Sequence, residues 1–227
     1  MRRLICMSIT IILTICVNAA FIQAAAFRGD EIHEGDLIEL GQYPQNKKEE
    51  DPGSPVSWLV LKIEGREALL LSEYCLDNIP YNMDDQDTSW KDCSLRQWLN
   101  SAFLEKTFTG DDRDRLIEKT QENEPNSVFD TPAGKSTKDY VFVLSEQEVG
   151  DNLKSRSDRR GRVTKWAEEQ GAYKHEEFET AFWWLRTPGK EKNEAMCVGA
   201  EGSVMMSGYM TLESDVAVRP AIWIRLD

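Results

Sequence analysis

Histidine is nearly absent from this chain, which has two among 227 residues, and cysteine is sparse at five. A hydrolase triad needs a histidine that a carboxylate orients beside a nucleophile, and neither His33 nor His175 lies in such a motif. A zinc site needs ligands paired about two to four residues apart, a spacing that the cysteines do not show. The sequence therefore predicts neither a catalytic triad nor a zinc centre.

Positive charge is also in deficit, because 27 lysines and arginines face 40 acidic residues and leave a formal net charge of −13. The acidic residues are spread along the chain rather than gathered in one run. Such a charge opposes binding to nucleic acid or to an anionic membrane through bulk electrostatics. We interpret the acidity mainly as a contribution to solubility.

The N-terminal segment predicts export. Two arginines at positions 2 and 3 precede an apolar run from Leu4 to Val17, and alanines occupy positions 24–26. This order is typical of a secretory signal peptide spanning residues 1–26, so we expect cleavage after Ala26. The alternative is an uncleaved N-terminal anchor, the one expected membrane attachment, because the apolar character persists almost far enough to span a bilayer. Either outcome predicts a secreted or envelope-associated protein.

Residues 27–227 are then expected to form one domain, which is long enough to bury a substantial core. Three cysteines remain in it, at positions 75, 93 and 197. In an exported protein a disulfide between Cys75 and Cys93 is one expectation, since it closes the shortest loop. Buried free thiols that act as small hydrophobic side chains are the other.

Strand signals lie at both ends of this domain. Residues 35–45 predict a short strand, and residues 56–71 predict a hairpin that turns at Glu64 and Gly65. The first strand of the hairpin is apolar on both faces, which is typical of a central strand. From Phe182 onward short strands alternate with turns. We expect the terminal strands to pair and to bring the two ends together.

Helix signals lie between these strands. Apolar residues from Leu95 to Ala102 follow the i, i+3, i+4, i+7 spacing of an amphipathic helix, and Trp98 on that face is expected to be structural. The expected N-caps are Asp92 or Ser94, Thr109, and Ser145 in a capping box with Glu148. A further short helix is expected to end at Gly171. The fold class is therefore α+β, with short helices in the middle and mostly antiparallel strands at both ends.

The order of these blocks, ending in "WWLRTPG" and "VAVRPAIWI", resembles a known family. It is similar to bacterial domains of unknown function, common in Gram-positive anaerobes, that carry the blocks WWLRSPG and VRPAxW. The resemblance covers nearly all of residues 27–227. Thr187 stands where that family usually has serine, and Ala217 stands where glycine is frequent.

The C-terminal pattern resembles, more loosely, the C-type-lectin-like fold shared with formylglycine-generating enzymes. In that group a Trp-rich strand, a Gly-centred hairpin and a final VRP-like strand close the domain. The resemblance implies a C-type-lectin-like mixed domain and says little about activity. It carries over no paired cysteines. A Glu-Pro-Asn tripeptide like the one that holds calcium in sugar-binding lectins occurs at 124–126, but it lies in the middle loop.

Tryptophan and arginine occur together in both closing blocks and suggest two roles. The functional interpretation is an aromatic platform for a sugar or a peptide, with arginine as a fork of donors. Its candidate residues are Trp183, Trp184, Arg186 and Trp223. The structural interpretation places one tryptophan in the core and lets arginines bind loop carbonyls and carboxylates. We expect the structural role for Arg219 and Pro220, and both roles stay open for Trp184 and Arg186.

The stretch "YNMDDQDTSW" is the best metal candidate. Its hard oxygen ligands at close spacing suit calcium, the one cofactor that we consider. The candidate ligands are Asn82, Asp84, Asp85 and Asp87. The glycine and glutamate of an EF-hand loop are missing, so a solvated acidic turn that leads into a helix is the alternative.

Two functions follow from these patterns. The first is an extracellular, non-catalytic module that binds a carbohydrate or a protein through a surface lined by tryptophan and arginine. The alternative is a secreted hydrolase that uses two carboxylates or a metal in the Asp84–Asp87 loop. A structural role in an envelope assembly is a third option. An enzyme needs a concave pocket with converging titratable groups, whereas a shallow aromatic face suffices for a binding module.

Overall fold

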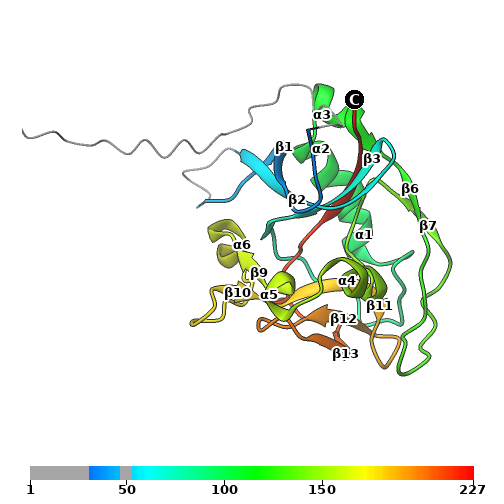
Figure 1. The fold of residues 1–227 in the computed structure, drawn as a ribbon. Coiled ribbons are helices and arrows are strands. Elements are labelled where there is room, and N and C mark those ends of the chain that lie inside the picture. Colours follow the sequence, from blue (N-terminus) through cyan, green and yellow to red (C-terminus); the bar gives the residue numbers. More distant parts are fainter. Residues whose placement is uncertain (1–30, 47–52) are drawn as a thin grey trace, which may run out of the picture.

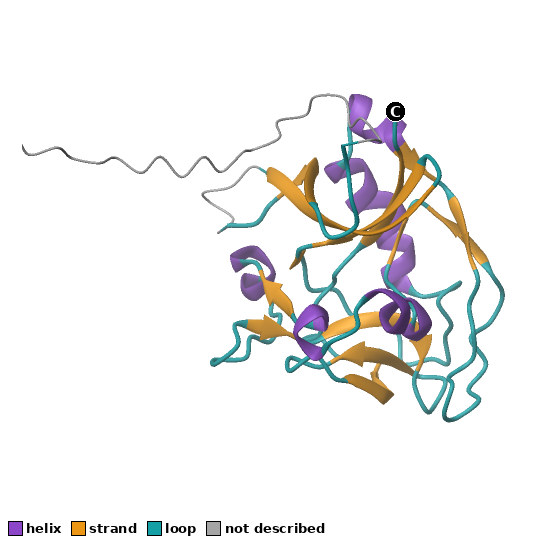
Figure 2. Cartoon of the chain, viewed as in Figure 1, coloured by secondary structure: helices purple, strands orange, loops and turns teal. Residues whose placement is uncertain are grey.

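The fold is mixed α+β, with mostly antiparallel strands and a few short helices (Figures 1 and 2). The computed structural model describes residues 31–46 and 53–227, so the predicted signal peptide and its cleavage site lie outside the described residues. Within these ranges no helix has the length and apolar character needed to cross a bilayer. The helices fall between Ser94 and Glu169, in the middle of the chain as predicted.

A six-stranded sheet holds the first strands and the last one. Its order is β1-β2-β3-β14-β5, and β8 also pairs with β14. The bounds are β1 (Leu37–Tyr43), β2 (Ser54–Glu64), β3 (Glu67–Ser72), β5 (Leu116–Ile117), β8 (Val141–Phe142) and β14 (Ala221–Arg225). The hairpin of β2 and β3 is confirmed, and Gly65 in its turn has a φ of +62°, a conformation that glycine adopts without strain.

The prediction that strands from the two ends of the domain pair is confirmed, because β14 pairs with β3 of the N-terminal hairpin. β1 pairs with β2, whereas β14 pairs with β3, so the β2–β3 hairpin lies between the two terminal strands. The physical reason is that β2 and β3 are apolar on both faces and take the central positions. The strand β14 is drawn in red in Figure 1, where it runs toward the C-terminus.

Smaller sheets build the rest of the molecule. One contains β11 (Trp183–Pro188), β12 (Glu194–Val198) and β13 (Val204–Met210) and occupies the lower part of Figure 1. Gly208 allows the bulge between β12 and β13, since a Cβ atom there would lie 2.5 Å from the carbonyl oxygen of Ala195. The other strands are β4 (Tyr74–Cys75), β9 (Gly161–Val163) and β10 (Thr180–Ala181) in one sheet, and β6 (Lys119–Gln121) and β7 (Thr137–Asp139) in another.

The predicted amphipathic helix is interrupted by a π-helical segment. α1 (Ser94–Trp98) leads into the π-helix η1 (Leu99–Phe103) and then into α2 (Leu104–Thr107). The wider π turn rotates the following side chains, so Ala102 is exposed although its spacing predicts the apolar face. Trp98 is structural in position, because it packs on the core with its ring 5.3 Å from that of Phe103.

The N-cap of α1 is Cys93, so neither Asp92 nor Ser94 takes the predicted role. The Cys93 sulfur accepts a hydrogen bond from the backbone N–H of Arg96 at 3.4 Å. The capping box of Ser145 and Glu148 is confirmed at the start of α4, whereas Thr109 begins α3 without a side-chain bond to it. The remaining helices are α3 (Gly110–Arg115), α4 (Glu146–Asn152), α5 (Arg156–Arg159) and α6 (Lys165–Glu169), and Gly171 follows α6 closely as predicted.

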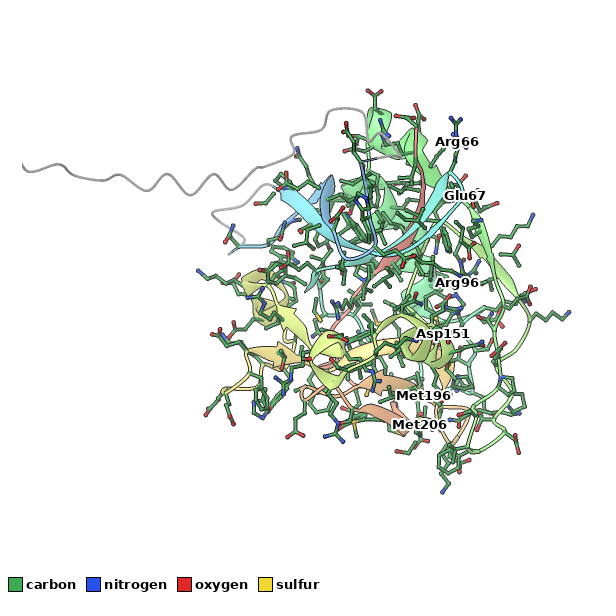
Figure 3. All side chains as sticks on the ribbon, in the orientation of Figure 1. Arg66, Glu67, Arg96, Asp151, Met196 and Met206 are labelled. Atoms are coloured by element: carbon green, nitrogen blue, oxygen red, sulfur yellow. The ribbon has the colours of Figure 1, made fainter. Side chains whose placement is uncertain are left out.

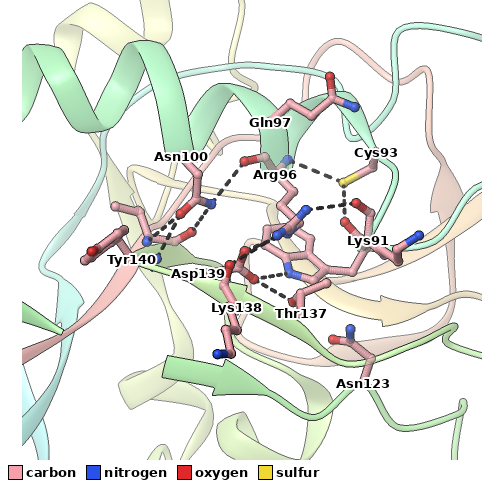
Figure 4. A network of polar contacts seen from close by, with 12 residues as sticks. Lys91, Cys93, Arg96, Gln97, Asn100, Asn123, Thr137, Lys138, Asp139 and Tyr140 are labelled. Atoms are coloured by element: carbon pink, nitrogen blue, oxygen red, sulfur yellow. Dashed lines mark hydrogen bonds and ion pairs between the residues drawn. The ribbon is translucent and has the colours of Figure 1, made fainter. Parts of the chain in front are cut away.

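A buried carboxylate ties α1 to β7 (Figure 4). Asp139 is 1% exposed and accepts hydrogen bonds from Arg96 Nε at 2.6 Å, Trp90 Nε1 at 2.9 Å and Thr137 Oγ1 at 2.7 Å. Arg96 also donates to the carbonyl oxygens of Lys91 and Lys138. Three side-chain donors satisfy this buried carboxylate, so we assign the network to the fold.

Candidate functional site

Three adjoining depressions form one groove, which we call the α4 groove, along α4 and the strand β14. The largest holds about 500 Å³ and shares Glu148, Asp151 and Trp223 with the second, which holds about 350 Å³. The second shares Glu124, Ser145 and Gln147 with the third. Figure 3 labels Asp151, which projects from α4. The shared residues show that the depressions are continuous.

Arg186 and Glu148 form an ion pair beside the groove. Arg186, in the covered strand β11, is 4% exposed. Its Nη2 donates to Glu148 Oε1 at 3.0 Å, its Nη1 donates to the other carboxylate oxygen, and Nη1 also donates to Val143 O at 3.1 Å. Glu148 accepts the backbone N–H of Ser145 at 2.8 Å in the capping box. The Glu148 carboxylate therefore caps the N-terminus of α4 and also neutralises the buried guanidinium of Arg186.

Trp223 supplies the aromatic side chain of the groove. It lies in β14, is partly exposed, and lines the two larger depressions. The ammonium group of Lys119 lies 4.8 Å from the centre of the indole, and Lys119 is ion-paired with Glu67. The groove thus brings together two of the predicted ligand residues, Trp223 and Arg186.

The other two predicted ligand residues lie in the core. Trp183 and Trp184 are both 0% exposed, and their indole N–H groups donate to the carbonyl oxygens of Arg159 and Ile79. The two rings do face opposite sides of a strand, as alternation requires, but β11 is covered on both sides. A four-residue platform is therefore not assembled, and for these two tryptophans the structural interpretation agrees with the geometry.

Arg219 has the geometry of a fold-closing residue. It is 3% exposed, and Nε donates to Ser72 O at 2.9 Å, with longer bonds to Glu73 O at 3.4 Å and to two further carbonyls. Its guanidinium carbon lies 5.2 Å from the Trp183 ring centre. Burial lowers the pKa of this guanidinium below its usual range. The adjacent Pro220 accepts the backbone N–H of Ser72, which joins the closing block to β3.

The predicted calcium loop is a largely exposed acidic turn. Asn82 is buried, and its Oδ1 accepts hydrogen bonds from the backbone N–H and hydroxyl of Ser94 while its Nδ2 donates to Asp84 O. Asp84, Asp85 and Asp87 are exposed. Among residues 31–46 and 53–227 no group of three His, Cys, Asp or Glu side chains is placed to hold a metal ion. The geometry matches the alternative, an acidic turn that leads into α1.

Cys75, Cys93 and Cys197 are all free and buried, so the Cys75–Cys93 disulfide is not formed in this structure. Burial raises the pKa of each thiol to about 12. A thiol with such a pKa is almost wholly protonated at neutral pH and is a poor nucleophile. The three cysteines therefore behave as small core side chains.

Asn126, in the Glu-Pro-Asn tripeptide, has a structural role that the sequence did not reveal. It is 0% exposed, and its Nδ2 donates to the carbonyl oxygens of Pro188, Gly189 and Met206. Its Oδ1 accepts the backbone N–H groups of Val128 and Phe129. Both ends of the Asn126 amide are occupied, so this side chain holds the loop against the β11–β13 sheet.

Residues 65–226 match a family described as domain of unknown function DUF6273. The chain belongs to this family. The DUF6273 match spans more than two thirds of the chain and contains Glu148, Asp151, Arg186 and Trp223 of the α4 groove. A search of curated proteins found no match, and a search of solved structures found none.

Proposed function

We propose that this DUF6273 domain is an extracellular, non-catalytic binding module that holds a glycan in the α4 groove. The observation that carries the proposal is the convergence of a partly exposed indole with amide and carboxylate side chains along one continuous groove. Sugars present hydroxyl groups at their edges and C–H groups on their faces. The groove offers donors and acceptors for the first and the Trp223 ring for the second.

The proposal also includes three expectations from the sequence. Export by residues 1–26 would place the domain outside the cell or in the envelope, where bacterial glycans are abundant. The C-type-lectin-like architecture is proposed on the order of the closing blocks, since the mixed antiparallel fold is compatible with it. A protein ligand remains the second occupant that the same groove could accept.

The hydrolase alternative would require carboxylates that are free to act on a bound ligand. Glu124, Glu148 and Asp151 line the groove. Both oxygens of Glu148 are bound by Arg186, and the amide of Gln147 can donate to Glu124. Proton transfer by Glu148 would have to break its ion pair, which supports binding over catalysis as the role of this groove.

The test is isothermal titration of the full-length protein with bacterial cell-wall glycans, alongside thermal unfolding. Gln147 and Asp151 are exposed, so Gln147→Ala and Asp151→Ala should unfold like the parent. We expect each to weaken glycan binding by about tenfold, the value of one or two lost hydrogen bonds. Glu105→Ala, an exposed change on α2 outside the groove, is the matched control and should bind like the parent.

Two results would overturn the proposal. One is equal binding of glycan by the parent and by both groove variants. The other is release of new reducing ends during the titration, which would support the hydrolase. In the parent, a glycan at about a hundred times its dissociation constant should raise the free energy of unfolding by about 2.7 kcal/mol.

A further inference from the structure

Five aromatic side chains form a continuous row on a different part of the surface. We call Tyr173, His175, Phe178, Phe182 and Tyr209 the aromatic strip. Successive ring centres lie 4.8 Å apart for Phe178 and His175, 6.5 Å for His175 and Tyr173, 5.4 Å for Tyr173 and Phe182, and 5.5 Å for Phe182 and Tyr209. The residues come from the segment around β10 and from β13, in the lower part of Figure 1, away from β14.

The rings of the strip are not sealed in the core. Tyr173 is 40% exposed, and the other four side chains are partly exposed. Trp183 and Trp184 in the neighbouring strand β11 are 0% exposed, so the fold can bury rings completely where packing requires it. Aromatic side chains in contact at a surface are enriched at binding interfaces.

Carboxylates flank the strip on two sides. Glu176, Glu177 and Glu179 are exposed in the loop that carries His175 and Phe178. On the other side Asp215 is exposed, and its backbone carbonyl oxygen accepts the N–H of Tyr173 at 2.8 Å. Burial raises the pKa of Tyr209, and Cys197 and the nearby carboxylates of Asp215 and Glu213 raise it further. An aromatic surface with a negative rim is complementary to a cation.

At one end of the strip, a cationic side chain of the protein itself already stacks on an aromatic ring. The guanidinium carbon of Arg160 lies 4.2 Å from the ring centre of Phe178. Lys174, the basic residue between Tyr173 and His175, forms ion pairs with Glu168 at 3.3 Å and with Glu179 at 4.0 Å. The strip thus already stacks one guanidinium, while the ring of Tyr173 keeps exposed surface.

We propose that the aromatic strip docks a basic segment of a partner protein, with arginine or lysine side chains stacked on its rings and paired with the flanking carboxylates. The occupant is a peptide because the row is longer than one ring and its acidic groups lie on both sides. Stacking and ion pairing act on the same side chain, so each docked arginine is recognised twice. This inference is independent of the α4 groove, which shares no residue with the strip.

The experiment measures binding of a fluorescent nonapeptide of alternating arginine and glycine to the full-length protein by anisotropy. A peptide with glutamine in place of arginine is the probe control. Tyr173→Ala leaves every charge in place and should weaken binding by about tenfold, the upper range for a cation–π contact. Phe182→Leu is a second variant of the strip. Phe129→Ala changes an aromatic residue of the same 40% exposure outside the strip and should bind like the parent.

Bulk charge is the competing explanation, because the chain has a net charge of −13. If Tyr173→Ala and Phe182→Leu bind the arginine peptide like the parent while salt alone weakens binding, the proposal is overturned. The same holds if the glutamine peptide binds equally well. Asp151→Ala in the α4 groove should not alter peptide binding, so failure of the glycan experiment and failure of this one are separable.

Discussion

Arg219 is the residue on which closure of the fold depends most directly. Its guanidinium donates to carbonyl oxygens of Ser72 and Glu73, which have few alternative partners in the core. Arg219→Ala leaves these acceptors unpaired and opens a cavity beneath Trp183. We expect the free energy of unfolding to fall by about 3 kcal/mol, measured by urea denaturation.

The matched control is Arg225→Ala, because Arg225 is an exposed arginine near the end of the same closing segment. It should change stability by less than about 0.5 kcal/mol. Arg219→Lys keeps the charge but cannot reach several carbonyls at once, so it should lie between the two. A denaturation midpoint for Arg219→Ala equal to that of the parent would show that water satisfies these carbonyls.

The two arginines of the closing blocks illustrate what single residues reveal in a sequence. Both stand beside an aromatic-rich strand and a proline, and the sequence predicts fold closure for Arg219 while leaving Arg186 open. The partners differ because Arg186 meets a carboxylate 38 residues away and Arg219 meets carbonyls 147 residues away. Such pairings depend on the tertiary path of the chain and leave no local signal in the sequence.

At the scale of elements, α4 and α5 offer a natural comparison. Both helices begin with a capping box, Ser145 with Glu148 and Ser155 with Asp158. The first carboxylate also pairs with the buried Arg186, whereas the second is exposed. Glu148→Gln keeps the shape of the side chain and strands a buried charge, so we expect a loss of about 3 kcal/mol.

Asp158→Asn is the same change at the exposed box and should have a far smaller effect on stability. Hydrogen bonds from Ser155 lower the pKa of Asp158, so its contribution is present above its usual pKa and is lost as pH falls. Urea denaturation of both variants at neutral pH makes the comparison. Equal losses at the two boxes would mean that the ion pair with Arg186 adds nothing beyond the cap.

Local elements and the pairing of strands from the two ends were predicted better than the side-chain contacts between elements. The β2–β3 hairpin and the capping box of α4 are encoded within a few residues, so the sequence indicates them correctly. The π-helical turn at 99–103 and the cap at Cys93 depend on how the helix packs, and periodicity predicted neither. The buried pair of Arg96 and Asp139 joins positions 43 residues apart, and no spacing rule indicates it.

For the whole molecule, the candidate surfaces were the least predictable part. The sequence selected three tryptophans and one arginine as ligand residues. Two of the three tryptophans are core, because tryptophan supplies large apolar area wherever a sheet is covered on both faces. The aromatic strip was missed because its rings are scattered over residues 173–209 and each looks ordinary alone. Its signal appears when the fold brings the rings together.

The buried thiols make a prediction about the whole molecule at alkaline pH. Burial holds the pKa of Cys75, Cys93 and Cys197 at about 12 in the folded state. In the unfolded chain a thiol titrates near about 8.5. Above that pH the unfolded state binds fewer protons than the folded state, so the stabilisation is complete below about pH 8.5 and is lost as the pH rises toward 12.

Urea denaturation between about pH 7.5 and about pH 10.5 should therefore show a falling free energy of unfolding, by about 1 kcal/mol per pH unit for each thiol. The triple variant Cys75→Ala, Cys93→Ala, Cys197→Ala should have a flatter profile, although Cys93 also caps α1 and its loss lowers stability at every pH. Alkylation read by peptide mass spectrometry should leave the three cysteines unmodified until the protein unfolds. If Cys75 and Cys93 formed a disulfide, they would instead resist alkylation even in the unfolded state. Of the three cysteines, only Cys197 would then contribute to the pH dependence of the free energy of unfolding.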